Sequence, residues 1–198
     1  MTLLTLAFLS NAHASDLSDA MREQAPTNKN KSVDVHLERE INASADAVWA
    51  LLGAGFAEIG GWAALVDASR EMTLADIPEG LVVAPQAPVL GRWTATGFGE
   101  PGEVLVMYSD VERALTFHAI DLPGFLKHSQ NTQQVLETGE NTCTVTFDIH
   151  AQPKFGFMAK KLESIFSEGL PGVLDDLAAY AETGEQSVAK KAAVAALD

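Results

Sequence analysis

The sequence predicts an α+β domain in which a run of antiparallel strands precedes one long C-terminal helix. A strand runs directly into a capped helix near the start of the domain. Several short segments of alternating apolar residues follow, separated by turn-forming residues. Residues 155–182 then carry a single apolar stripe at helical spacing. Such a stripe can be buried against one face of the preceding sheet, which is a common arrangement of layers.

The first strand and the first helix follow each other directly. Apolar positions recur between polar ones along residues 33–42, as in a half-buried strand. Ser44 can accept a hydrogen bond from the free amides of a first helical turn, and Asp46 lies where the helix dipole favours a negative charge. We therefore expect a helix over residues 44–53 and a second short helix over residues 55–60.

Six further strands are expected before the long helix. Turn signals such as Gly99-Glu100-Pro101-Gly102 separate them. Connections this short favour antiparallel pairing. The expected strands are residues 66–73, 92–98, 103–109, 114–120, 128–137 and 142–151.

The last long element is predicted to be a helix over residues 155–182. Pro171 lies inside it and removes one backbone hydrogen bond, so we expect a kink just before this residue. Gly184 ends the helical pattern. The Ala- and Lys-rich tail, residues 184–198, is expected to be either a frayed helix or disordered.

The N-terminus contains two of the three elements of a secretory signal peptide. A short apolar core is followed by Ala12-His13-Ala14, which fits a cleavage site, but no basic residue precedes the core. Two interpretations stay open. Either residues 1–14 are a signal peptide and the protein is periplasmic or secreted, or they are an apolar terminus and the protein is cytoplasmic. Residues 15–32 are polar and are predicted to be a linker.

Composition and charge restrict the classes of partner. The chain has 198 residues, of which 47% are hydrophobic, and this suits one domain with a core of its own. It carries 13 basic and 27 acidic residues, a net charge of −14. A field of that sign repels nucleic-acid phosphates and anionic lipid surfaces, so no nucleic-acid partner is expected. No apolar segment has the length of a membrane-spanning helix, so no stable membrane insertion is expected.

Cofactor and metal chemistry also lack support in the sequence. The single cysteine, Cys143, excludes an intramolecular disulfide and a Cys-based zinc site. The histidines lack the spacing of known metal motifs, and no phosphate-binding or dinucleotide-binding loop is present. We therefore expect neither a metal nor a cofactor.

Four short motifs occur in a characteristic order and spacing. They are I-x-A-[SP]-x-x-x-V-W-x-x-L, W-x-x-x-V, D-x-E-R-x-L-x-F and G-L-P-x-x-L-x-x-L, which begin at Ile41, Trp62, Asp110 and Gly169. Together they resemble the START-like, birch-pollen-allergen-like superfamily, also called SRPBCC, in its polyketide cyclase/dehydrase and lipid-transport branch. The resemblance covers residues 33–183. It implies a helix-grip fold, in which a curved antiparallel sheet surrounds the long C-terminal helix and two short helices lie near the N-terminus.

Two positions depart from the pattern of this superfamily. Many members have proline two residues after the second Trp, where this chain has Ala64. Many bacterial relatives carry a glutamate well inside the fourth strand. Here that strand contains Val104-Leu105-Val106-Met107, and Glu103 lies only at its edge. We expect this departure to weigh against carboxylate-based cyclase chemistry.

The resemblance implies an internal cavity, and strand alternation indicates which side chains reach it. We expect Phe117 to point inward and His118 outward. Residues 128–134 are polar on both faces, so either some of them hydrogen-bond the polar end of a ligand or they form a poorly buried edge with bound water. The candidate ligand-binding residues are Trp62, Arg92, Tyr108, Phe117, Gln130, Thr132, Val145, Phe147, Leu162 and Phe166.

The preferred function is binding, and by extension transport, of an apolar or amphipathic small molecule or lipid in a pocket of roughly 300–1,000 Å³. A first alternative is a polyketide cyclase/dehydratase-like enzyme that uses the same cavity. His128 and Tyr108 would then be the catalytic acid–base residues. A second alternative is a non-catalytic stress or interaction protein whose core is filled.

Overall fold

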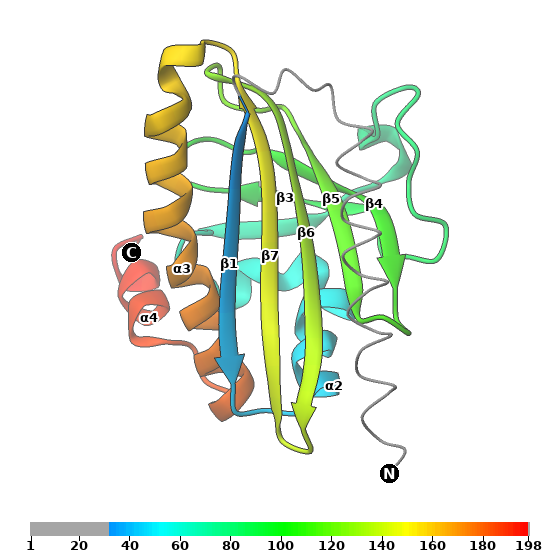
Figure 1. The fold of residues 1–198 in the computed structure, drawn as a ribbon, viewed down its shortest axis with the longest axis vertical. Helices are drawn as coiled ribbons and strands as arrows, with labels where there is room; N and C mark the ends of the chain where they lie inside the picture. Colours follow the sequence, from blue (N-terminus) through cyan, green and yellow to red (C-terminus); the bar gives the residue numbers. More distant parts are fainter. Residues whose placement is uncertain (1–31, 198) are drawn as a thin grey trace.

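The computed structural model describes residues 32–197, and these form one seven-stranded antiparallel sheet with helices on one side (Figure 1). The strand order is β1-β7-β6-β5-β4-β3-β2. The expectations for residues 1–14 and for most of the linker lie outside the described residues. The strands are β1 (Val33–Ile41), β2 (Ala68–Glu71), β3 (Gly91–Ala95), β4 (Gly102–Ser109), β5 (Ala114–Ile120), β6 (Leu126–Gly139) and β7 (Thr142–Pro153).

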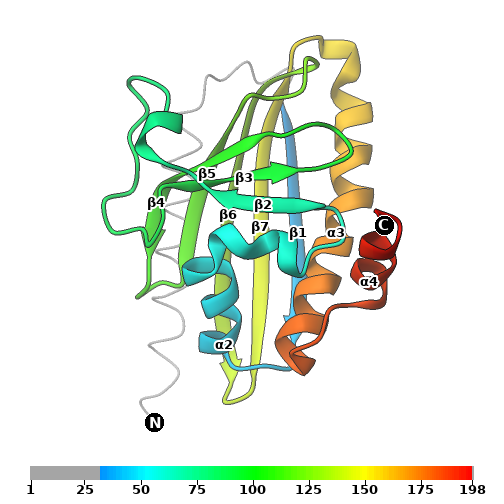
Figure 2. The ribbon, with the colours of Figure 1, turned by 180° about the vertical axis from the view of Figure 1, so that it is seen from behind.

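The helices cover one face of this sheet. The long helix α3 (Ala159–Thr183) runs beside β1, and Figure 2 shows the short N-terminal helices on the same side. The side chains of Leu162, Val173 and Leu177 on α3 are buried in the core. This arrangement confirms the predicted helix-grip α+β fold. The other helical segments are α2 (Ala45–Trp49), η1 (Ala50–Ala54), η2 (Phe56–Gly61), η3 (Leu74–Asp76), η4 (Gly156–Met158) and α4 (Val188–Ala195).

The first helix begins as the sequence predicts. Ser44 is its N-cap, and the side-chain oxygen accepts a hydrogen bond from the amide of Ala47 at 3.3 Å. After Trp49 the helix widens into a π-turn and ends at Gly55. The indole of Trp49 lies so close to Gly53 that a Cβ there would be 2.6 Å from a ring carbon. Glycine is therefore required where this ring folds back over the widened turn.

Several boundaries differ from the prediction. β2 is shorter than expected: it is an edge strand of the sheet and pairs with β3 over four residues only. β6 and β7 are longer than expected because they pair with each other along almost their full length. α3 continues past Pro171 without ending, and Gly184 caps it in the left-handed conformation, with φ of 73°.

The tail contains a packed helix, α4, and not a frayed end. The side chain of Ser187 caps α4 by accepting a hydrogen bond from the amide of Lys190 at 3.0 Å. Lys190 is buried, and its Nζ donates to the carbonyl of Val66 at 2.7 Å. The buried carboxylate of Asp176 on α3 accepts from the amide of Ala64 at 2.7 Å and from the hydroxyl of Ser187. α4 therefore joins α3 to the loop before β2.

Replacing Asp176 with alanine should lower the free energy of unfolding by about 1–3 kcal/mol, because the buried partners of its carboxylate lose their acceptor. The neighbouring Asp175 is a matched control: its side chain is 61% exposed and pairs with Arg39 at 3.2 Å. Loss of such a surface pair should cost no more than about 1 kcal/mol. Urea unfolding of Asp176→Ala and Asp175→Ala measures both effects, and equal losses would contradict the anchoring role of Asp176.

Candidate functional site

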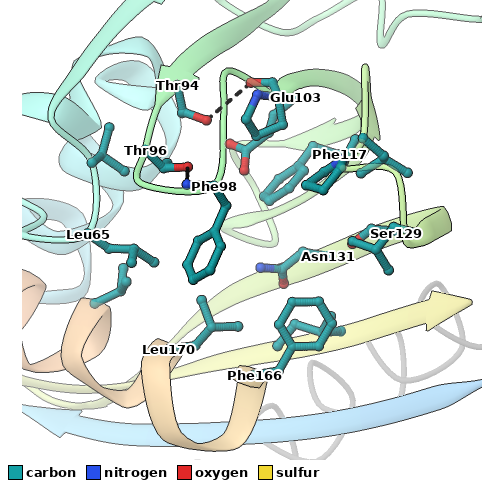
Figure 3. Close-up of a pocket in the computed structure, with 18 of the residues that line it drawn as sticks. Leu65, Thr94, Thr96, Phe98, Glu103, Phe117, Ser129, Asn131, Phe166 and Leu170 are labelled. Carbon is teal, nitrogen blue, oxygen red and sulfur yellow. Dashed lines mark hydrogen bonds between the residues drawn. The ribbon is translucent and has the colours of Figure 1, made fainter. Parts of the chain in front are cut away.

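A cavity of about 200 Å³ lies between the inner face of the sheet and the first half of α3 (Figure 3). Its walls are mainly apolar and are formed by residues of strands β3 to β7, of α3 and of the loops that border them. The cavity is smaller than the expected 300–1,000 Å³, and five phenylalanines are among its lining residues. Phe98, on the turn between β3 and β4, is 61% exposed and lies where the cavity opens to solvent.

Five of the residues predicted from the sequence line this cavity. Four of them are apolar wall residues that strand and helix periodicity had placed inward, and the fifth is Arg92. Val145 lies on the same face of β7 as Phe147 but is fully buried in the core below the cavity. Trp62 is also a core residue and not part of the cavity mouth, with 3% of its surface exposed. The five are Arg92, Phe117, Phe147, Leu162 and Phe166.

β6 presents polar side chains to both faces of the sheet. Ser129, Asn131 and Gln133 line the cavity. The predicted residues Gln130 and Thr132 are one position out of register with these three and point to the opposite face. There Gln130 hydrogen-bonds His118 at 2.9 Å and Thr132 hydrogen-bonds Thr116 at 3.0 Å. Placing Gln130 and Thr132 in the cavity was therefore wrong, because a strand that is polar on both faces carries no alternation to indicate its orientation.

The amides of Asn131 and Gln133 are the unsatisfied polar groups of the cavity wall. Asn131 is 8% exposed and Gln133 is 4% exposed. Within the described part of the chain, Asn131 Oδ1 and Gln133 Oε1 have no hydrogen-bond partner. Figure 3 shows the Asn131 amide directed into the space near Phe98, Phe166 and Leu170. A buried acceptor without a donor costs about 1–3 kcal/mol, so these two groups call for a donor in the cavity.

An ion pair forms another polar part of the wall. Arg92 on β3 and Glu103 on β4 are direct partners in the sheet register. Arg92 Nε donates to Glu103 Oε2 at 2.5 Å, and Nη1 donates to the carbonyl of Phe56 at 2.7 Å. Burial lowers the pKa of Arg92, and the Glu103 carboxylate opposes this change. Arginine nevertheless keeps its proton in proteins. The pair therefore gives the cavity a cation whose charge is already compensated.

Glu103 lies at the edge of its strand, as expected, and it nevertheless borders the cavity. β4 begins one residue earlier than predicted, at Gly102, and Glu103 lines the cavity beside Arg92. The sequence shows that Arg92 and Glu103 have opposite charges. It does not show the register of β3 and β4 that places the two side chains next to each other.

Tyr108 lies outside the cavity. Its hydroxyl donates to Asp110 Oδ1 at 2.7 Å, and the same oxygen accepts from the indole of Trp49 at 2.8 Å. Burial and the hydrogen bond to Asp110 raise the pKa of Tyr108, and the bonds from Trp49 and Tyr108 lower the pKa of Asp110. This network fastens α2 to the end of β4. It leaves Tyr108 poorly suited to acid–base catalysis.

His128 lies on the outer face of the sheet, away from the cavity. Its ring centre is 5.4 Å from that of His118 and 6.0 Å from that of His150. Burial and then the two neighbouring histidines lower the pKa of His128 to about 4. His150 in turn contacts Asp34 Oδ1 at 2.8 Å. Tyr108 and His128, the two predicted catalytic residues, are therefore not brought together.

Other site classes find no support in residues 32–197. No group of histidine, cysteine, aspartate and glutamate side chains there is arranged to hold a metal ion. None of the helices in this range is both long and apolar enough to cross a membrane.

Comparison with known proteins gives a family match. Residues 32–182 match the family described as polyketide cyclase/dehydrase and lipid transport. A comparison with curated proteins gives no significant match. Solved structures at identities below 25% show that the fold is shared. They include a START superfamily protein from Mycobacterium smegmatis (10% identity, TM-score 0.62, 77% of this chain and 99% of that chain). XoxI from Bacillus cereus is similar at 22% identity and TM-score 0.57, over 77% and 94% of the two chains. Norcoclaurine synthase from Thalictrum flavum, in complex with dopamine and hydroxybenzaldehyde, is similar at 16% identity and TM-score 0.58, over 79% and 90%.

The lowered pKa of His128 predicts a loss of stability in acid. Below its ordinary pKa of 6.5, this histidine takes up a proton in the unfolded chain, whereas the folded chain resists protonation until about pH 4. The unfolded state therefore binds more protons in this window, and the free energy of unfolding falls as the pH decreases through it.

His128→Phe keeps a ring of similar size and should flatten this part of the pH profile. Urea unfolding of the wild type and of His128→Phe between about pH 4 and 6.5 measures how steeply the free energy of unfolding changes with pH in each protein. The lowered pKa of Asp110 affects both proteins equally, so it does not contribute to the difference between them. Parallel profiles, or an NMR titration of His128 near 6.5, would contradict the prediction.

Proposed function

Because the chain belongs to the polyketide cyclase/dehydrase and lipid-transport family, we propose that it binds one apolar or amphipathic small molecule in the cavity beneath α3. The observation that carries this proposal is the pair of buried amide oxygens, on Asn131 and Gln133, that have no partner among the described residues. They open into a space whose other walls are mainly apolar. A small molecule with an apolar body and a hydrogen-bond donor would satisfy both parts of this surface.

The apolar part of the ligand would contribute most of the affinity. Phe117, Phe147, Leu162 and Phe166 offer the walls against which it would be removed from water. Burial of apolar surface is worth about 25 cal/mol per Å². A cavity of about 200 Å³ favours a compact ligand or one short chain over a bulky polycyclic molecule.

The polar part of the ligand would be neutral. Arg92 is already paired with Glu103, so it offers little attraction to a second carboxylate. Glu103 itself borders the cavity and would repel an anionic ligand. The unsatisfied groups of Asn131 and Gln133 are acceptors that need a donor. An alcohol, a phenol or an amide therefore fits this wall better than a fatty acid.

The alternatives are weaker on this geometry. A cyclase or dehydratase would need an acid–base group in the cavity, and Glu103 would have to take that role in place of His128 and Tyr108. Its carboxylate is held by Arg92, so it serves charge compensation first. An interaction protein with a filled core does not fit a cavity lined by unsatisfied amides.

Binding should be detectable with N-phenylnaphthylamine, a neutral apolar fluorophore. We expect one probe per chain, with enhanced fluorescence. Ala119→Phe places a ring into the cavity from β5 and should weaken binding by about tenfold or more, equivalent to about 1.4 kcal/mol. Val111→Phe adds the same ring at a position that is 88% exposed in the β4–β5 turn, and should leave binding unchanged. Absence of probe binding to the wild type, or equal binding by both variants, would overturn the proposed site.

Selectivity for a neutral head group should appear in competition between octanol and octanoate at about pH 8, where the acid is ionised. Glu103→Gln should raise the affinity for octanoate by about tenfold, because the Arg92 charge is then uncompensated. Asn131→Leu should weaken octanol binding by about fivefold to tenfold through loss of a hydrogen bond. Gln134→Leu, on the opposite face of β6, is the matched control. An unchanged octanol-to-octanoate preference in Glu103→Gln and Asn131→Leu would refute the role of these groups while leaving apolar binding intact.

A further inference from the structure

We infer that the end of the molecule where β7 passes into α3 is a docking site for the surface of an anionic lipid bilayer. This end is called the Phe-Lys end here. It lies at the top of Figure 1. The inference goes beyond ligand binding in the cavity and is tested without any ligand. The Phe-Lys end consists of Lys127, Lys154, Phe155, Phe157, Lys160 and Lys161.

Two aromatic rings are exposed at this end without a packing role. Phe155 is 54% exposed and Phe157 is 85% exposed. Their ring centres are 5.8 Å apart and the rings are stacked. Phe155 is the N-cap of the single turn of η4 and Phe157 lies within that turn, where the chain leaves β7 and enters α3. A pair of phenylalanines that contact each other but not the core indicates a surface that is covered by a partner.

The charges around these rings differ from those on the rest of the molecule. Thirteen lysines and arginines occur in the chain, and three of them precede residue 32, so ten are described. All four described arginines form ion pairs with carboxylates, and so does Lys191. Lys190 is buried against the carbonyl of Val66. The other four form no ion pair with any residue of the range 32–197, and all belong to the Phe-Lys end: Lys127, Lys154, Lys160 and Lys161.

Acidic residues are sparse around this end. Residues 122–128 and 149–162 contain neither aspartate nor glutamate. The neighbouring strand β1 contains one acid in this region, Asp34, and its carboxylate contacts His150. The nearest acids along the chain are Asp121, before the β5–β6 loop, and Glu163, on α3. The Phe-Lys end is therefore locally basic on a protein whose net charge is −14.

This end adjoins the cavity. The amide of Lys154 donates to the carbonyl of Phe125 at 2.8 Å, and Phe125 is a lining residue of the cavity. Leu126, the next residue, also lines the cavity and pairs with Pro153 in the sheet. A bilayer that binds the Phe-Lys end would therefore also lie close to the cavity wall.

Exposed phenylalanines flanked by lysines have the chemistry of a peripheral membrane contact. The rings can enter the boundary between head groups and acyl chains, and each lysine near anionic head groups strengthens binding by roughly fivefold. The strongly acidic remainder of the protein would be repelled by the same surface, which orients the molecule with this end toward it. Such a contact requires no membrane-spanning helix, in agreement with the described helices.

Vesicle flotation tests this inference with the full chain. We expect binding to phosphatidylcholine vesicles that contain roughly 30 mol % phosphatidylserine, little binding to pure phosphatidylcholine, and release at about 0.5 M salt. The double variant Lys160→Glu/Lys161→Glu should weaken binding by at least about 25-fold, at roughly fivefold for each lysine. Phe157→Ser should weaken it by roughly fivefold or more through loss of apolar insertion.

The matched control is Arg39→Glu/Lys191→Glu, which changes the net charge by the same amount at positions outside the Phe-Lys end. This control variant should bind anionic vesicles nearly as well as the wild type does. Circular dichroism checks that each variant is folded. Equal loss in both double variants, equal binding to neutral vesicles, or no vesicle binding by the wild type would overturn the inference. The cavity variant Ala119→Phe should still bind vesicles, so failure of this inference and failure of ligand binding are separate results.

Discussion

The buried guanidinium of Arg92 is the interaction on which the arrangement of the cavity depends. A charge with 3% exposure is tolerated only where it is paired and hydrogen-bonded. Here Glu103 supplies the opposite charge, the carbonyl of Phe56 accepts a second hydrogen bond, and the ring of Phe56 lies 3.9 Å below the cation. Phe117 is the next ring, at 5.6 Å. One side chain of β3 thereby fixes β4, η2 and β5 relative to one another.

This network also explains why the cavity combines apolar walls with little net charge. The cation and the carboxylate satisfy each other, and the β6 amide oxygens are left without a partner among the described residues. β6 can carry such groups because its two faces meet different surroundings. Asn131 and Gln133 face the cavity, whereas Gln130 and Thr132 bond to β5 side chains on the other face. Because both faces of β6 are polar, its sequence does not alternate between apolar and polar residues, and it therefore does not indicate which side chains face the cavity.

Much of the fold could be predicted because its signals are local. Ser44 capped the first helix as expected, Gly184 ended the long one, and the candidate residues Phe117, Phe147, Leu162 and Phe166 line the cavity. What could not be predicted depends on contacts between distant segments. The pairing of Arg92 with Glu103 requires the β3–β4 register, and a shift of one residue inverts every side chain of a strand.

The C-terminal helix α4 illustrates the same limit. The tail offers few local signals beyond Ser187, which caps the helix. Its burial depends on Asp176, more than ten residues earlier, and on the carbonyl of Val66, which lies 124 residues before Lys190 in the chain. A lysine in an Ala- and Lys-rich tail is usually solvated, so the buried Lys190 could be recognised only in three dimensions.

The distribution of charge, and not the net charge alone, decides how the protein meets a lipid surface. Net charge is informative for a partner that contacts a large part of a protein, such as a nucleic acid, because most charges then act together. A flat lipid surface that touches one end is different, since salt screens exposed charges beyond roughly 10 Å. Such a surface interacts with Lys160 and Lys161 far more than with carboxylates at the opposite end of the sheet. Ion pairing has already neutralised the described arginines, so the unpaired lysines decide the local sign. An acidic chain can therefore present a basic, aromatic end to an anionic membrane, and a net charge of −14 does not exclude that partner.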